Sequence, residues 1–187
     1  MPLPARDAMP PQLARRPLFR GYPVPFTTLI GPDGVPDFKV TDEAKREEVL
    51  RRRMCALCGE PLGYWIAFIG SETLIGLREF YDPAMHEACA RYAAQTCPFL
   101  ALSDAKYATP RRRGVTIEPT HHLADVTRPK RMGLYLTRTY AIVPRRISAT
   151  STVLMVRAGR ATSIDWEIMP EGSGGSPSVP TAGMGGP

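Results

Sequence analysis

Cys55-Ala56-Leu57-Cys58-Gly59 is the stretch of sequence that decides the fold. Two cysteines separated by two residues can place both sulfur atoms on one ion across a tight turn. Gly59 follows directly and tolerates the unusual backbone angles that such a turn requires. Farther along, His86 and Cys89 are three residues apart, so on a helix they share one face. The set Cys55, Cys58, His86 and Cys89 therefore predicts a single metal site.

Zinc suits this set of donors better than other metals. Thiolate and imidazole ligands in a tetrahedron match its borderline-soft character, at roughly 2.3 Å to sulfur and 2.0–2.1 Å to nitrogen. An iron–sulfur cluster would usually need four cysteines. Four protein ligands leave no open coordination position, so we expect Zn²⁺ to be structural and not catalytic.

Cys97 is an alternative to His86 as the fourth ligand. It follows Cys89 by eight residues, which on a helix is about 80° farther round and two turns away. It would therefore have to fold back to reach the ion. We favour His86 as the ligand and expect Cys97 to be a packed thiol.

The chain between the two halves of the site predicts a hairpin and a helix. Leu62–Ile69 and Thr73–Tyr81 are strand-like runs separated by Gly70-Ser71-Glu72, and Asp82 can cap a helix from Pro83 to about Thr96. The turn that carries Cys55 and Cys58 is called the knuckle below. Knuckle, hairpin and helix in this order resemble a treble-clef zinc finger over residues 54–97. We expect the aromatic residues near the site to pack a small core; they are Tyr64, Trp65, Phe68, Phe80, Tyr81 and Phe99.

The flanking segments predict short strands and one further helix. Pro25–Ile30 and Val35–Val40 are β-prone and joined by a turn-forming loop, and Thr41 or Asp42 can cap a helix that continues to Arg53. Near the other end, alternating or β-branched runs predict three strands. These runs are Leu134–Val143, Thr152–Val156 and Ile164–Ile168.

The expected fold class is α+β, with small antiparallel sheets and hairpins around a zinc-knuckle and helix centre. With 20 Pro and 16 Gly, the chain is also rich in residues that interrupt helices and strands. We expect five segments: a flexible Pro-rich arm (1–21), a zinc-stabilised module (22–102), a basic loop region (103–132), a C-terminal β region (133–170) and a flexible tail (171–187).

Charge is distributed unevenly along the chain. The net charge is +6, yet residues 55–100 hold 2 basic and 5 acidic residues, whereas residues 111–160 hold 11 basic and 2 acidic residues. A basic half can attract nucleic acid or an acidic protein, although a solvated Arg-rich surface is the ordinary interpretation. Candidate contacts to such a partner are Arg111, Arg112, Arg113, Arg128, Lys130 and Arg131.

The sequence disfavours a membrane protein, a secreted precursor and an enzyme. The longest apolar run, Tyr64–Ile69, is far short of the roughly 20 residues that span a bilayer. The start of the sequence lacks the apolar centre of a signal peptide. Cysteines without a secretion signal indicate a reducing compartment, so we expect the cytoplasm. Phosphate-binding glycine loops and nucleophile elbows are absent from the sequence.

A degenerate zinc-dependent nuclease is a remaining enzymatic hypothesis. Treble-clef scaffolds host phage nucleases of the His-Asn-His class, and His121-His122 lies in an Arg-rich context here. However, that chemistry usually needs an Asn to orient the catalytic base, and the sequence contains no Asn. We expect His121 and His122 to be loop residues or alternative metal ligands.

Several segments together resemble an uncharacterised family of small proteins from actinobacteria and their phages. The matching segments are Tyr22–Phe26, Gly34–Val40, Cys55–Gly63, His86–Ala90 and Cys97–Leu100. The resemblance implies a metal site but no biochemical activity, and a phage protein would act in the host cytoplasm. The sequence thus favours a non-enzymatic zinc-binding interaction module. The alternatives are a nucleic-acid-binding protein that uses residues 111–160, and the degenerate nuclease.

Overall fold

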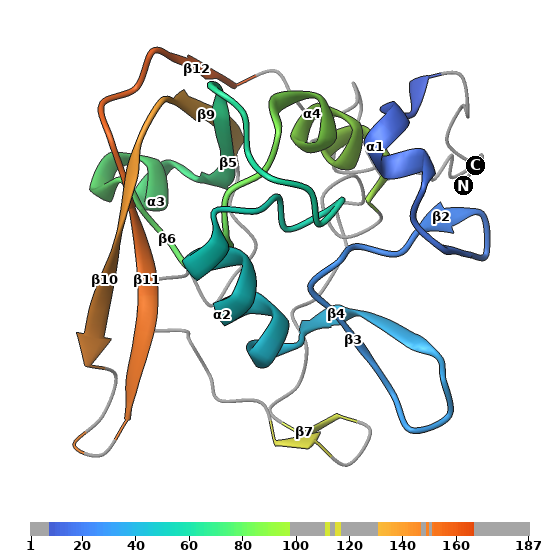
Figure 1. The fold of residues 1–187 in the computed structure, drawn as a ribbon. Helices are drawn as coiled ribbons and strands as arrows, with labels where there is room; N and C mark the ends of the chain where they lie inside the picture. The colour runs from blue at the N-terminus through green and yellow to red at the C-terminus, as the bar shows by residue number, and fades with distance from the viewer. Residues whose placement is uncertain are drawn as a thin grey trace, which may run out of the picture.

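The computed structural model describes residues 8–97, 111–112, 115–116, 131–146, 149 and 151–166. Within these ranges the fold is α+β, as the sequence predicts, with short helices among small antiparallel sheets (Figure 1). The helices are α1 (Pro11–Ala14), α2 (Glu43–Arg52), α3 (Glu72–Leu77) and α4 (Glu87–Thr96). The longer strands are β4 (Pro36–Thr41), β5 (Ile66–Ser71), β9 (Met132–Thr137), β10 (Tyr140–Arg146) and β11 (Thr152–Ala158). The shorter ones are β1 (Leu18–Phe19), β2 (Tyr22–Pro23), β3 (Thr28–Ile30), β6 (Glu79–Phe80), β7 (Arg111–Arg112), β8 (Val115–Thr116) and β12 (Ser163–Asp165).

Strand β5 is the centre of the fold, and all six of its residues are buried. It pairs antiparallel with β9, and β12 lies on the other side of β9. Because successive side chains of a strand point to opposite faces, β5 contributes to two hydrophobic clusters. Ala67 and Ile69 pack with Cys89 and other residues of α4. Ile66 and Phe68 pack with residues of β6 and β11.

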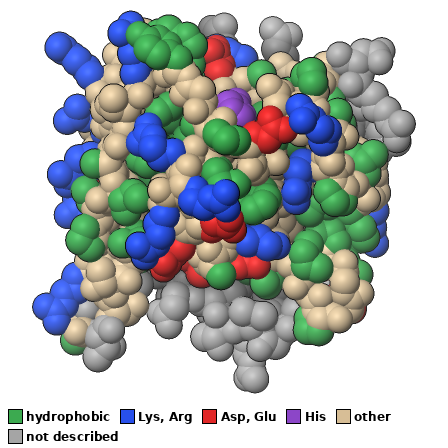
Figure 2. Space-filling model, in the orientation of Figure 1, with side chains coloured by type: hydrophobic (Ala, Val, Ile, Leu, Met, Phe, Trp, Pro, Cys, Tyr) green, Lys and Arg blue, Asp and Glu red, His purple; other side chains and the backbone are tan. Residues whose placement is uncertain are grey.

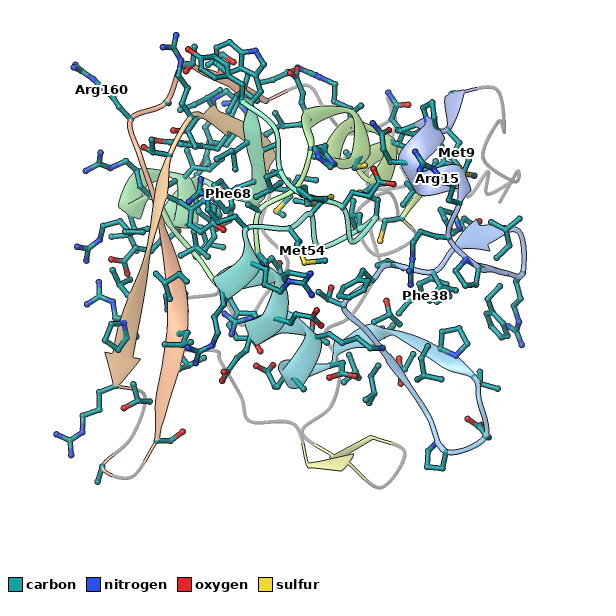
Figure 3. The ribbon with its side chains drawn as sticks, viewed as in Figure 1. Met9, Arg15, Phe38, Met54, Phe68 and Arg160 are labelled. Carbon is teal, nitrogen blue, oxygen red and sulfur yellow. The ribbon has the colours of Figure 1, made fainter. Side chains whose placement is uncertain are left out.

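The second cluster lies beneath a long ribbon of β10 and β11, seen along one edge of the molecule in Figures 1 and 3. β11 also pairs with β6, so that Val156 is opposite Phe80. Phe80 stacks on Phe68 of β5, with 4.7 Å between ring centroids. The ribbon is therefore held on β5 through aromatic contacts, and not by a backbone ladder to it.

Helix α2 is held against the ribbon by a buried arginine. Asp42 caps the helix by accepting hydrogen bonds from the backbone N–H groups of Ala44 and Lys45, as the sequence predicts. Arg46 has a relative exposure of 1% and donates to the backbone carbonyls of Tyr81 and Leu154. These two acceptors satisfy a buried cation that would otherwise be costly.

The hairpin expected between Leu62–Ile69 and Thr73–Tyr81 does not form. Ser71 instead caps α3 by accepting a hydrogen bond from the backbone N–H of Leu74, and the chain leaves the helix through Arg78 in the left-handed region. β6 then pairs with β11 and not with β5. A serine cap inside an apolar run has therefore converted the second expected strand into a helical turn.

Two other boundaries differ from expectation. α4 begins at Glu87 and not at Pro83, because Met85 exchanges two backbone hydrogen bonds with Ala67 of β5. The single strand expected over Leu134–Val143 is two strands, β9 and β10, which separate at residues 138–139. The expected strands at 152–156 and 164–168 correspond to β11 and β12.

The N-terminal region is more structured than the extended arm that its prolines predict. α1 places Leu13 in the cluster that surrounds the cysteines, with a relative exposure of 2%. β1 and β2 form a small hairpin, and β3 and β4 form the hairpin expected from the sequence. Residues 98–110, 117–130 and 167–187 lie outside the described residues, and they include most of the expected basic loop region (103–132) and all of the expected tail (171–187).

No helix within the described parts of the chain combines the length and apolar character needed to cross a bilayer.

Glu79 connects β6 to the ribbon as a buried carboxylate. Its side chain is 4% exposed and pairs with Arg145 at 2.6 Å and with Arg157 at 2.7 Å. Burial alone would raise the pKa of Glu79, but the hydrogen bonds and charges of the two arginines hold that pKa below its usual value. The stabilisation is therefore present above the usual carboxyl pKa and is lost as pH falls through the lowered value.

We predict that Glu79→Gln lowers the free energy of unfolding by about 1–2 kcal/mol at pH 7, because charge-assisted hydrogen bonds are lost. The difference from the wild type should shrink as the pH falls from the usual carboxyl pKa through the lowered pKa of Glu79. Urea unfolding at several pH values measures both effects. Glu72→Gln is the control, because the Glu72 side chain is 63% exposed and lies 3.6 Å from Arg131; a change below about 0.5 kcal/mol is expected there. Equal effects of the two substitutions would contradict the buried role of Glu79.

Candidate metal centre

The first half of the site is a tight knuckle between α2 and β5. α2 ends at Arg53 in the left-handed region (φ 53°), and Met54 then pairs with Pro61 across the turn. The backbone N–H of Cys55 donates to the Glu60 carbonyl at 2.8 Å, and that of Gly59 donates to the Cys55 carbonyl at 2.9 Å. These bonds close the loop that carries both cysteines.

The second half of the site is the start of α4. His86 is the N-cap residue of the helix, and Cys89 lies in its first turn. Both side chains therefore lie at the N-terminal end of α4. The backbone N–H of His86 also donates to Cys55 Sγ at 3.4 Å, which joins this helix end directly to the knuckle.

The four ligand atoms of Cys55, Cys58, His86 and Cys89 all lie within 4.8 Å of one another. His86 Nδ1 lies 3.4 Å from Cys58 Sγ and 4.0 Å from Cys89 Sγ. A tetrahedral zinc ion with ordinary bond lengths would separate a sulfur and a nitrogen ligand by about 3.5 Å. The cluster thus has the dimensions of a metal site.

The His86 ring is oriented by a second contact. Its Nε2 lies 2.9 Å from the backbone carbonyl of Pro61, at the end of the knuckle. A carbonyl can only accept, so Nε2 carries the hydrogen and Nδ1 is left to face the sulfur atoms. Such a contact behind a histidine ligand fixes the tautomer and the ring orientation.

The surroundings of the cluster are apolar. Cys55 and Cys89 have relative exposures of 0% and Cys58 of 6%. The cysteines pack with Leu13, Ala67 and other residues of the first hydrophobic cluster. His86 is half-buried, so it forms the side of the site nearest the solvent.

When no metal ion is bound, the pKa values of the ligand side chains are shifted in opposite directions. Hydrogen bonds with the Cys58 and Cys89 thiols lower the pKa of Cys55. Hydrogen bonds with Cys55 and Cys58 raise the pKa of His86 to about 10 and, together with burial, raise that of Cys89. A metal ion must displace the protons of His86 and Cys89, so its apparent affinity should increase as the pH rises.

The cluster contains His86 and not Cys97. Cys97 is the C-cap of α4, at the far end of the helix from His86 and Cys89. The knuckle and the helix therefore meet as the sequence predicts, although the hairpin that a treble clef would place between them is absent.

Of the six candidate basic residues, the structure describes the side chain of Arg131 alone. Arg131 lies 3.6 Å from Glu72 and packs over the Trp166 ring, at 4.7 Å from its centroid. Only the backbone of Arg111 and Arg112 is described, in β7. The other candidates lie outside the described residues, as do both histidines of the nuclease hypothesis: Arg113, Arg128, Lys130, His121 and His122.

Tyr64 and Trp65 are the residues whose surroundings the sequence does not predict. Phe68 and Phe80 are buried in the core as expected, but Tyr64 is 64% exposed and Trp65 is 37% exposed. Arg138 packs over both exposed rings. Gly63, which precedes the pair and marks the end of the knuckle, is the sequence feature that could have indicated exposure.

Comparison with protein-family models, with curated proteins and with solved structures finds no match.

We predict that Gly59→Ala destabilises the zinc-saturated protein by about 1–3 kcal/mol and weakens metal binding. Gly59 has a φ of +79°, and an added Cβ would lie 2.5 Å from Cδ2 of the Phe26 ring. Chemical unfolding and competition with a chromophoric chelator measure the two effects.

Gly63→Ala is the matched control, because an added Cβ there meets no atom within 4 Å. A change below about 0.5 kcal/mol is expected for an unhindered surface position. If Gly59→Ala were as stable as Gly63→Ala, the knuckle would not require this backbone conformation.

Proposed function

We propose that the protein is a zinc-binding, non-enzymatic interaction module in which one structural Zn²⁺ is held by Cys55, Cys58, His86 and Cys89. The observation that carries the proposal is the convergence of these four ligand atoms within 4.8 Å. Two of the ligands come from the knuckle and two from the start of α4, about thirty residues later in the sequence. An ion at this point would add to the hydrogen bonds that His86 forms with Cys55 and Pro61, and would tie the knuckle to the start of α4.

The chemistry of the donors supports zinc. Three sulfur ligands and one imidazole favour a borderline-soft ion that accepts tetrahedral geometry. Hard cations such as Mg²⁺ and Ca²⁺ prefer oxygen ligands, which this cluster does not offer. All four cysteines of the chain are free thiols, as a reducing compartment such as the cytoplasm would keep them.

A structural role follows from the number of ligands. An ion that takes all four side chains has no coordination position left for water or substrate, whereas catalytic zinc keeps such a position. The ion would instead contribute its binding free energy to folding, because the unfolded chain does not hold the four ligands together.

Because the zinc ion would have a structural role, a partner of the module would bind to another part of the protein surface. Nucleic-acid binding by residues 111–160 remains a hypothesis, and the Arg145–Glu79 and Arg157–Glu79 ion pairs already use two of its arginines. The nuclease hypothesis requires His121 and His122 near the metal. Membership of the actinobacterial and phage family likewise remains a proposal.

We predict that the purified protein binds one zinc ion per chain and that Cys58→Ser loses at least a hundredfold in zinc affinity. Loss of a structural ion should lower the melting temperature by about 10 °C, since each kcal/mol shifts it by about 2–4 °C in a protein of this size. Native mass spectrometry and thermal melts with and without chelator measure these effects.

Cys97→Ser is the matched control, because Cys97 lies outside the cluster. It should bind zinc and melt with the same response to chelator as the wild type. Cobalt substitution gives an independent count, since the absorption of the Co²⁺ form should indicate three thiolate ligands in the wild type and two in Cys58→Ser. A metal-free wild type, or a melt that chelator does not change, would overturn the proposal.

A further inference from the structure

Two neighbouring aromatic side chains lie exposed next to the metal centre. Tyr64 and Trp65 have relative exposures of 64% and 37%, and their ring centroids are 5.0 Å apart with planes at 79°. They belong to the short segment between Pro61, whose carbonyl lies 2.9 Å from His86 Nε2, and β5. Exposed rings on a constrained segment offer faces on which a flat ligand can stack.

Arg138 lies over both rings. Its guanidinium carbon is 5.0 Å from the Tyr64 centroid and 5.2 Å from the Trp65 centroid. The strand register explains the contact, because Ile66 of β5 is opposite Thr137 of β9 and the next residues outward are Trp65 and Arg138. A guanidinium stacked on a ring keeps the N–H groups at its edge available for phosphate. Among the described residues no carboxylate forms an ion pair with Arg138.

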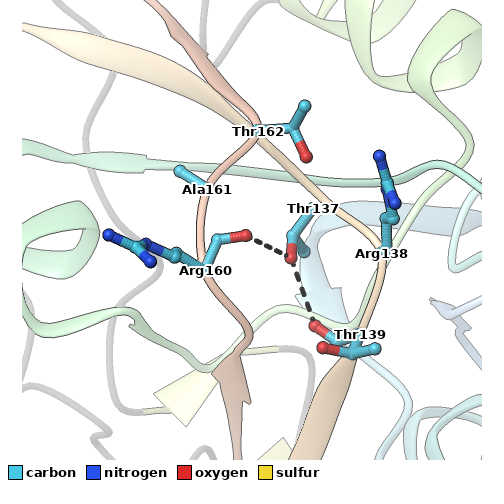
Figure 4. A pocket seen from close by; sticks show the side chains of 6 residues that line it. All are labelled: Thr137, Arg138, Thr139, Arg160, Ala161 and Thr162. Carbon is cyan, nitrogen blue, oxygen red and sulfur yellow. Dashed lines mark hydrogen bonds between the residues drawn. The ribbon is translucent and has the colours of Figure 1, made fainter.

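A shallow pocket of about 450 Å³ continues from Arg138. Figure 4 shows its lining, which consists of Thr137, Arg138, Thr139, Arg160, Ala161 and Thr162. Thr137 Oγ1 donates to the Arg160 carbonyl at 2.9 Å and so joins the two segments that form the pocket.

The second arginine of the pocket is also available to a ligand. Arg160 and Arg138 lie on opposite sides of Thr137, and Arg160 points outward at the edge of the molecule (Figures 3 and 4). The guanidinium group of Arg160 has no ion-pair partner in the part of the chain that the structure describes. Figure 2 shows further basic side chains along the same edge, over the β10–β11 ribbon, where the sequence has arginines and no lysine.

We infer that Tyr64, Trp65, Arg138 and Arg160 form a binding site for single-stranded nucleic acid. Unpaired bases would stack on the two aromatic rings, and Arg138 and Arg160 would contact phosphates. Because the arginines flank the pocket on opposite sides, they suit successive phosphates of an extended strand better than a single phosphate group. Duplex nucleic acid would not offer free base faces to the rings.

The site differs from the one that the charge of the sequence indicates. Of its four residues only Arg138 and Arg160 belong to the basic region 111–160, and none is among the six candidate basic residues. Other arginines of that region are paired internally, such as Arg145 and Arg157 with Glu79. A combination of stacking faces and unpaired cations is the general feature of proteins that bind single strands.

This assignment of a partner rests on the proposed function, because zinc ligation by His86 would fix the knuckle that precedes the aromatic pair. The two proposals can nevertheless be refuted independently of each other. Zinc content and the chelator-sensitive melt report on the metal centre, whereas oligonucleotide affinity reports on the surface. A protein that holds zinc and binds no oligonucleotide would refute only the surface site.

The experiment measures fluorescence anisotropy of labelled single-stranded DNA and RNA of one sequence, and of the DNA duplex, with the full-length zinc-loaded protein. We expect binding of a single strand at micromolar concentration and weaker binding of the duplex. Trp65→Leu should weaken single-strand binding about tenfold or more, with an unchanged dependence on salt, because it removes a stacking face and no charge.

The double variant Arg138→Gln/Arg160→Gln should act on the salt dependence. A plot of log affinity against log salt has a negative slope, and for single strands each phosphate contact contributes about −0.7 to it. Loss of two contacts should therefore make the slope less steep by about 1.4. Zinc content and melting temperature should match the wild type in each variant, which separates loss of the site from loss of the fold.

The control variants make the same chemical changes elsewhere. Phe38→Leu removes an aromatic residue with 40% exposure on β4, and Arg51→Gln removes an arginine that is paired with Glu47 on α2. Both should bind like the wild type. The inference is overturned if the single strand does not bind, if the duplex or polyglutamate binds as tightly, or if the site variants bind no more weakly than these controls.

Discussion

The convergence of four ligand side chains at one point is the constraint on which the rest of the structure depends. The knuckle can supply Cys55 and Cys58 only because its backbone closes on itself through the Cys55–Glu60 and Gly59–Cys55 hydrogen bonds. α4 can supply the other two only because it begins at Glu87, one residue after His86. The Met85–Ala67 contact that delays the start of the helix is therefore part of the site, since it sets the position of His86 relative to β5.

The sequence predicts the parts of the fold that depend on local chemistry. The Asp42 cap, the ends of α2, the β3–β4 pair and the two halves of the cluster agree with expectation, because each follows from residue types a few positions apart. The choice of His86 over Cys97 belongs to the same group, since helical geometry alone separates Cys97 from Cys89 by two turns. Spacing within each segment thus identifies the two pairs of ligands, and the shared metal-binding chemistry of their side chains relates one pair to the other.

The parts that the sequence does not predict depend on contacts between distant segments. Thr73–Tyr81 has the composition of a strand, yet its last residues find β11 as a partner and its first residues form α3. Leu13 is buried although prolines surround it, because the cysteine cluster offers an apolar surface to cover. Tyr64 and Trp65 are exposed because β5 begins at Ile66, a boundary set by pairing with a strand some seventy residues later. Local composition contains no information on any of these partners.

The alternation of side chains along β5 links the two hydrophobic clusters mechanically. Ala67 and Ile69 face the cysteines and α4, while Ile66 and Phe68 face the ribbon. Neither cluster can be opened without displacing the strand that forms a wall of the other. The two cores should therefore behave as one cooperative unit, in which backbone amides of β10 and β11 gain or lose protection from hydrogen exchange together with those around the knuckle.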